Sequence, residues 1–122
     1  MPVLPRGYNV HHNDDVDETE EVISTGPATL YGCIVSNEHA TADMFVQYYN
    51  AAAVTPGTTV PVITIQVPAQ IGKEVEWVGG ITFGTALSVV CLTGGNDADT
   101  TGAATDDVCV STLWLSGSQR GG

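Results

Sequence analysis

The chain has 122 residues, of which 43% are hydrophobic and 14% charged, so it is long enough for one domain with a modest core. Its 14 acidic residues outnumber three basic ones, and the net charge of −11 argues against binding to nucleic acid or to anionic membranes. No apolar run approaches the roughly 20 residues that cross a bilayer, and the N-terminus has no apolar core of a signal peptide, so neither is expected.

The first 27 residues differ in composition from the rest of the chain. They contain the run DDVDETEE (14–21), with six carboxylates in eight residues. Like-charged runs are usually solvated, so residues 1–27 are expected to form an extended N-terminal arm, with at most one or two helical turns in the acidic run. The apolar side chains of this arm are the candidate contacts to a neighbouring chain: Val3, Leu4, Tyr8 and Val10.

From residue 28 onward, short alternating apolar segments separated by turn residues predict β-strands. The strands are expected at 28–36, 44–51, 58–69, 75–84, 85–93 and 108–116. The segment 58–69 has Pro61 near its start and Pro68 near its end, which predicts a strand at the edge of a sheet. Gly79 and Gly80 predict a bulge or sharp bend in the segment 75–84.

Six or seven strands with short connections favour antiparallel pairing. We expect an all-β protein whose residues 28–116 form an antiparallel β-sandwich or jelly-roll-like domain, preceded by the arm and followed by a flexible tail at 117–122. A closed small barrel is the alternative architecture.

The three cysteines, Cys33, Cys91 and Cys109, all lie in predicted strands. An odd number without a signal peptide argues against a disulfide framework, and we expect small buried side chains with free thiols. Neither His39 nor the pair His11 and His12 belongs to a catalytic motif, and the motifs of common hydrolases and nucleotide-binding enzymes are absent. The sequence therefore predicts a protein that is not an enzyme.

Two clusters could hold a metal ion, but neither has the required spacing. The loop at 96–107 offers D-x-D carboxylates for Ca²⁺ without the glycine and glutamate of an EF-hand, so a solvated loop is expected. His11 and His12 beside Asp14 and Asp15 lack the spacing of a preformed site. We expect no cofactor and no bound metal.

The aromatic side chains permit a second kind of site. A sugar-stacking platform could be formed by Tyr31, Tyr48, Tyr49, Trp77 and Trp114. Aromatic residues on strands more often belong to the core or to a protein interface. Trp114 shares a strand face with Val108, Val110 and Thr112, so it is expected to be at least half buried.

The body of the chain resembles small all-β virion proteins of tailed bacteriophages over roughly residues 28–116. The segments that carry the resemblance are ATLYGCIVSNEHATADMFVQYYNA, TPGTTVPVITIQVPA, GGITFGTALSVVCLTG and DDVCVSTLWL. The resemblance implies a structural virion protein, in particular a cement or decoration protein on the capsid surface that is made in the host cytoplasm. The implied partners are the major capsid protein and copies of the chain itself, as a dimer or trimer. The alternative is a carbohydrate-binding or host-attachment module of the virion, in a head fibre or the tail.

Overall fold

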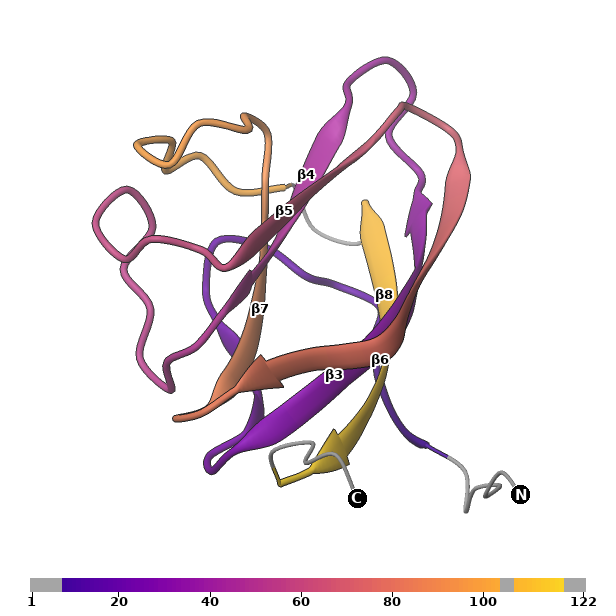
Figure 1. Cartoon of the computed structure of the whole chain (residues 1–122). Helices are drawn as coiled ribbons and strands as arrows, with labels where there is room; N and C mark the ends of the chain where they lie inside the picture. Colours follow the sequence, from indigo (N-terminus) through magenta and orange to yellow (C-terminus); the bar gives the residue numbers. More distant parts are fainter. Residues whose placement is uncertain (1–7, 104–106, 118–122) are drawn as a thin grey trace.

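In the computed structural model, residues 8–103 and 107–117 are described, and all their regular structure is β-strand (Figure 1). The predicted all-β class is therefore confirmed. The eight strands are β1 (Asn9–Asn13), β2 (Glu21–Ser24), β3 (Ala28–Asn37), β4 (Met44–Tyr49), β5 (Ile63–Val67), β6 (Gly72–Phe83), β7 (Leu87–Leu92) and β8 (Val108–Ser116).

The strands form two antiparallel sheets of four, with the order β1-β8-β3-β6 in sheet A and β2-β7-β4-β5 in sheet B. The first strand pairs with the last, the second with the seventh, the third with the sixth and the fourth with the fifth. The chain thus follows the path of one long hairpin wound into two layers, and β3–β8 and β4–β7 pairing completes the sheets. This is the strand order of a jelly roll, and it replaces the closed barrel that was the alternative.

The inner faces of both sheets pack into one core. Leu30 and Val35 of β3 and Val46 and Tyr48 of β4 are fully buried in it, together with Phe83 at the end of β6. Period-two alternation places such residues on one face of each strand and explains why the strands were recognisable from the sequence. A hydrogen bond of 2.8 Å between the Tyr48 hydroxyl and Thr112 Oγ1 joins sheet B to sheet A inside the core.

The segment predicted as an arm belongs to the sandwich from residue 9 onward, so the arm assignment for residues 1–27 is wrong over this part. β1 pairs with β8 in sheet A, and β2 pairs with β7 in sheet B. Between them, Val16 is only 1% exposed and lies in the main core. Its amide donates to Val108 O, and Asp17 O accepts the Cys91 amide, so backbone hydrogen bonds hold the acidic run against the sandwich.

The proline-flanked strand lies at a sheet edge, as predicted. β5 pairs only with β4 at the end of sheet B, and it is shorter than expected, because regular pairing begins at Ile63 and ends before Pro68. Ile65 and Val67 face the core, whereas Val62 is exposed. A proline without an N–H can lie at each end of an edge strand because no ladder hydrogen bond is needed there.

The predicted bulge is also present. Opposite Tyr31 of β3, the pairing with β6 jumps from Leu30–Ile81 to Gly32–Glu76, so the residues between 76 and 81 protrude from the sheet. Gly79 and Gly80 have φ angles of 86° and 79°, in the left-handed region that glycine adopts without strain.

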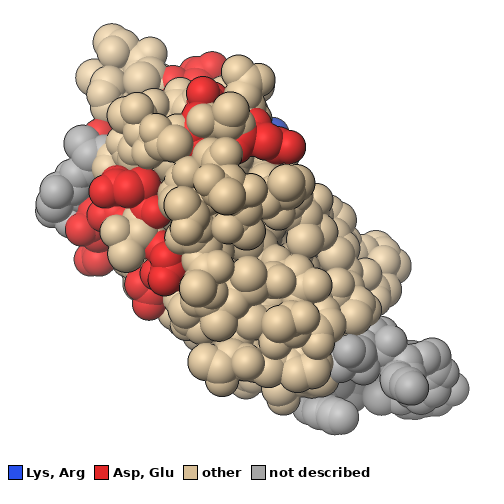
Figure 2. Space-filling model, turned by 90° about the vertical axis from the view of Figure 1, so that its left-hand side faces the viewer, with Lys and Arg blue, Asp and Glu red and all other residues tan. Residues whose placement is uncertain are grey.

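The chain's own loops cover the outer face of sheet B over β4 and β7, whereas Thr64 and Gln66 on β5 are exposed. Val54 and Ala51, in the connection between β4 and β5, pack on Tyr49, Val90 and Leu92 and form a second, smaller core. Ser88 Oγ donates to Ala51 O at 2.6 Å and fixes this connection over β7. Figure 2 views the molecule from this side and shows acidic side chains gathered toward one end, beside a broad surface without charged residues.

Gly117, the last described residue, is hydrogen-bonded to residues at the start of β3. The Gly117 amide donates to Pro27 O, and Thr29 Oγ1 donates to Gly117 O. Residues 118–122, the remainder of the predicted tail, lie outside the described part of the chain.

Candidate interaction surface

The outer face of sheet A, called here the open face, carries exposed side chains on β1, β3 and β6 and partly exposed side chains on β8. Strand pairing sets Val10 beside Leu113, Leu113 beside Gly32, and Gly32 beside Glu76. The next row along the strands consists of His12, Ser111, Ile34 and Glu74. The open face therefore combines apolar side chains at its centre with carboxylates along β6.

Several large apolar side chains are left in solvent on this face. Val10 is 61% exposed, Ile34 is 46% exposed, and Val78 at the bulge is fully exposed. Tyr8, immediately before β1, is also exposed, and its ring stacks on that of Tyr31 with centroids 4.9 Å apart. Grouped apolar exposure of this kind is typical of an interaction surface, whereas single exposed residues need no explanation.

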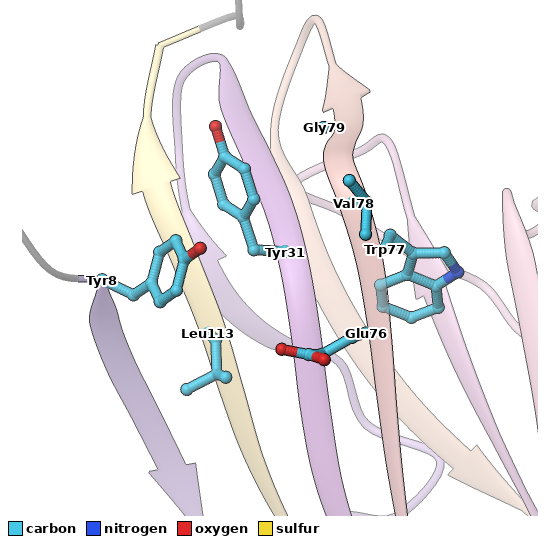
Figure 3. Close-up of a pocket in the computed structure, with 7 residues that line it drawn as sticks. All are labelled: Tyr8, Tyr31, Glu76, Trp77, Val78, Gly79 and Leu113. Atoms are coloured by element: carbon cyan, nitrogen blue, oxygen red, sulfur yellow. The ribbon is translucent and has the colours of Figure 1, made fainter. Parts of the chain in front are cut away.

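A shallow cavity of about 190 Å³ lies within the open face (Figure 3). Its lining residues are Tyr8, Tyr31, Glu76, Trp77, Val78, Gly79 and Leu113. The cavity lies beside Gly32, whose missing side chain leaves room between Leu113 and Glu76. A Cβ atom on Gly32 would lie 2.6 Å from Val75 O, so close approach of β6 requires glycine at this position.

The electrostatic character of the cavity comes from Glu76. Its side chain extends from β6 toward β3, and Glu74 occupies the neighbouring outward position on the same strand (Figure 3). Both carboxylates are exposed. Among the described residues, an ion pair is found between His11 and Glu21, at 3.5 Å, and it involves neither Glu74 nor Glu76. Acidic groups beside aromatic rings and aliphatic side chains suit a partner that presents a cation with apolar neighbours.

The structure describes two of the four residues that were predicted to contact a neighbouring chain. Val3 and Leu4 lie outside the described residues. Tyr8 and Val10 are exposed on the open face, but they are held by their own chain, through the Tyr31 ring and through the pairing of β1 with β8. The expectation that these two would leave the body to reach a neighbour is therefore corrected, because β1 is part of sheet A.

The predicted aromatic platform is not assembled. Tyr48 and Tyr49 are buried on opposite faces of sheet B, and Trp114 packs against the main core, which confirms its expected burial. Trp77 lines the cavity at its edge, but its indole points away from Tyr31 and packs against the core (Figure 3). Tyr31 has Tyr8 as its stacking partner instead, a residue that was expected in the arm.

A cysteine and a histidine come together on the open face. Cys109 Sγ lies 3.7 Å from His12 Nε2, and His12 Nδ1 lies 2.8 Å from Ser111 Oγ. Burial, with the nearby carboxylates of Asp14 and Glu38, raises the pKa of the Cys109 thiol. A raised pKa opposes formation of the thiolate that a nucleophile needs, so this pair lacks the electrostatics of a cysteine protease.

The other two cysteines are buried in the sandwich, as predicted, and all three thiols are free. Burial raises the pKa of Cys33 to about 11 and that of Cys91 to about 12. Burial also raises the pKa of the Tyr48 hydroxyl well above its ordinary value. These groups stay protonated near neutral pH and act as packing residues in the core.

Asp99, a candidate metal ligand, and His39, which was considered for catalysis, both have structural roles in turns. Within 8–103 and 107–117, no three of the histidine, cysteine, aspartate and glutamate side chains form a group suited to a metal ion. Asp99 accepts the Asn96 amide through Oδ2 and closes a turn of the 96–107 loop, while Asp106 lies outside the described residues. His39 Nδ1 accepts the amides of Thr41 and Ala42 and shapes the turn between β3 and β4.

The cavity itself was not predicted from the sequence, and Glu76, Val78 and Leu113 in its lining were not among the candidate residues. Leu113 and Glu76 were placed on strands, and their outward direction follows from alternation, since Thr112 is buried and Val75 is partly buried. The strand order that brings β8, β3 and β6 side by side could not be read from these local patterns. One feature of the sequence could have indicated this site. Val78 precedes the two glycines of the predicted bulge, and an apolar residue at a bulge has no core position to fill.

Comparison with known proteins gives no assignment. No family model matches the chain, and no curated protein matches it. Among solved structures, a chain from Bacillus endospore appendages, described as a novel family of disulfide-linked pili, is similar, with 12% identity, a TM-score of 0.42, and coverage of 95% of this chain and 96% of that chain. A likeness at this score carries no argument about function. The described residues also contain no helix of the length and apolarity needed to span a membrane.

Proposed function

We propose that the chain is a structural virion protein of a tailed bacteriophage. In this role it would act as a capsid cement or decoration protein that binds the outer surface of the major capsid protein shell and stabilises it. The observation that carries the proposal is the contrast between the two sheets. The chain's own loops cover β4 and β7 of sheet B, whereas the open face of sheet A leaves Val10, Ile34 and Val78 in solvent. An exposed apolar sheet face suits a protein that binds other proteins.

Two further observations support the same proposal. The resemblance of residues 28–116 to small phage virion proteins supplies the assembly in which such a face would be used. The jelly roll is a frequent architecture of viral capsid proteins, although it also occurs in lectins, so the fold by itself does not decide between them. Three free cysteines fit synthesis in a reducing host cytoplasm.

The open face also gives some support to a second candidate, a carbohydrate-binding or host-attachment module of the virion. Tyr8, Tyr31 and Glu76 line one cavity, and sugars are commonly held by aromatic rings and carboxylates. However, the Tyr8 and Tyr31 rings stack on each other, so neither presents both faces to a ligand. Protein attachment is therefore the better-supported function.

The proposal is tested on particles of the virus that encodes the chain. Antibodies against the purified protein should label the capsid surface in electron micrographs, and the chain should copurify with particles through a density gradient. Labelling of fibres or tails together with binding to a glycan array would favour the second candidate. Absence of the chain from purified particles would refute both.

A further inference from the structure

We infer that the cavity on the open face receives the N-terminal segment of a second copy of the chain, residues 1–7, with Arg6 of that segment against Glu76. The inference rests on the proposed function only in treating the open face as an interaction surface. It adds that residues 1–7 of a second copy fill the cavity, and that the charges of Arg6 and Glu76 select this segment. It also adds that the copies contact one another head to tail.

Charge complementarity is the first argument. Glu74 and Glu76 place two carboxylates at the cavity on a chain whose net charge is −11, so whole surfaces of two copies repel each other. Arg6 is one of three basic residues in the sequence, and the segment MPVLPRG around it contains no acid. Residues 1–7 are thus a part of the chain that an acidic cavity attracts, although the chain as a whole is acidic.

Side-chain chemistry is the second argument. Val3 and Leu4 are apolar, and the fixed φ angles of Pro2 and Pro5 reduce the conformational entropy that the segment loses on binding. The cavity offers Leu113, Val78 and two tyrosine rings to such side chains. A guanidinium beside tyrosine faces and a carboxylate gains from both cation–π and charge-assisted contacts.

The position of Tyr8 favours a second copy over the same chain. Residues 1–7 precede Tyr8, whose ring occupies the side of the cavity next to β1 and stacks on the Tyr31 ring (Figure 3). Glu76 is on β6, three strands away from β1, a distance of about 14 Å at normal strand spacing. Arg6 lies two residues before Tyr8 in the sequence, and the roughly 7 Å of extended chain that two residues span is about half of this distance. A segment of seven residues spans up to about 24 Å when extended, enough to cross from a neighbouring copy.

The segment and the cavity are different surfaces, so the contact between copies is heterologous. Such contacts form a ring when the rotation between copies closes and an open chain when it does not. Either arrangement lets many copies cooperate on a repeating shell, because linked copies gain avidity from weak individual contacts.

The test is a charge exchange followed by sedimentation velocity of the purified chain at about 0.15 M salt, where repulsion between distant charges of the two copies is largely screened. Wild type should associate with rising concentration, and Arg6→Glu or Glu76→Arg should each lower the association constant about tenfold or more. An equimolar mixture of the two single variants should recover association, because contacts between unlike copies then include pairs of opposite charges. Asp97→Arg, a reversal at an exposed position in the loop between β7 and β8, is the matched control and should preserve association.

Far-UV circular dichroism and urea midpoints establish that each variant is folded. A wild type that stays monomeric at every concentration would overturn the inference, as would single variants that associate like wild type. If the double variant Arg6→Glu/Glu76→Arg recovers association but the mixture does not, the inference is also overturned, because the segment then occupies the cavity of its own chain. None of these outcomes affects labelling of virus particles, so this inference and the proposed function fail separately.

Discussion

Val16 provides the strongest test of the finding that the acidic N-terminal run belongs to the sandwich. Its side chain is 1% exposed and packs in the main core between β1 and β2. Val16→Ala removes two methyl groups, which at about 0.8 kcal/mol per buried carbon lowers the free energy of unfolding by about 1.6 kcal/mol. The cavity left behind adds up to about 1 kcal/mol if the surroundings do not relax. We therefore expect a loss of about 2 kcal/mol.

Urea unfolding followed by tryptophan fluorescence measures this loss. With a slope of about 2 kcal/mol per molar urea, the midpoint should fall by about 1 M while the slope itself is unchanged. Val10→Ala is the matched control, because Val10 is 61% exposed on β1 and its truncation should change stability by less than about 0.5 kcal/mol. Equal midpoints for the two variants would refute the placement of Val16 in the core and restore a solvated arm.

Three further predictions concern the body of the sandwich. The thiols of Cys33 and Cys91 have pKa values raised to about 11 and about 12 from an ordinary 9.0, so the unfolded chain releases their protons first as pH rises. Stability should hold below pH 9 and fall through pH 9–12, and replacing both cysteines by alanine should flatten that part of a profile of urea midpoint against pH; an unchanged slope would contradict this. Gly80→Ala should destabilise more than Gly79→Ala in thermal unfolding, because both have positive φ but only at Gly80 would a Cβ meet a neighbour, Thr29 Cγ2 at 2.4 Å; equal losses would show that the bulge relaxes. Tyr48→Phe leaves its buried hydroxyl partner on β8 unpaired and should cost about 1–3 kcal/mol by urea unfolding, and a neutral effect would mean that this hydroxyl finds another hydrogen-bond partner.

Part of the body was predictable because some of its strands alternate between buried and exposed residues. β5 and β8 show this alternation, and flanking prolines identified β5 as an edge strand. β7 is buried on both faces, since loops cover its outer side, and its continuous apolar run was still recognisable as a strand. The two glycines at the bulge were informative because positive φ angles are costly for other residues.

The first two strands escaped prediction for a physical reason. β1 reads NVHHN and β2 is only four residues long, so neither carries enough buried apolar residues to show a period of two. Both lie at sheet edges and derive their stability from backbone pairing with β8 and β7. Val16 was not predicted to be buried because it lies within the charged run at 14–21. Its burial depends on the turn that carries the chain from one sheet to the other, which the local sequence does not specify.

The candidate surface was predictable only in part. Tyr8 and Val10 were selected as apolar residues in a polar segment, which is a local property of the sequence. The cavity depends on contacts between β1, β8, β3 and β6, which are distant in sequence, and on the absence of a side chain at Gly32. Such a site follows from topology, so it became visible only with the strand order.

The central claim, that the open face of sheet A attaches the chain to a virus particle, is tested most directly by a cryo-electron microscopy map of the particle. We expect density for the sandwich on the capsid, with the outer face of β1, β8, β3 and β6 turned toward a neighbouring subunit and Val10, Ile34 and Val78 buried in the contact. A map in which the sandwich attaches through the loops over sheet B, with these three side chains facing solvent, would contradict the account.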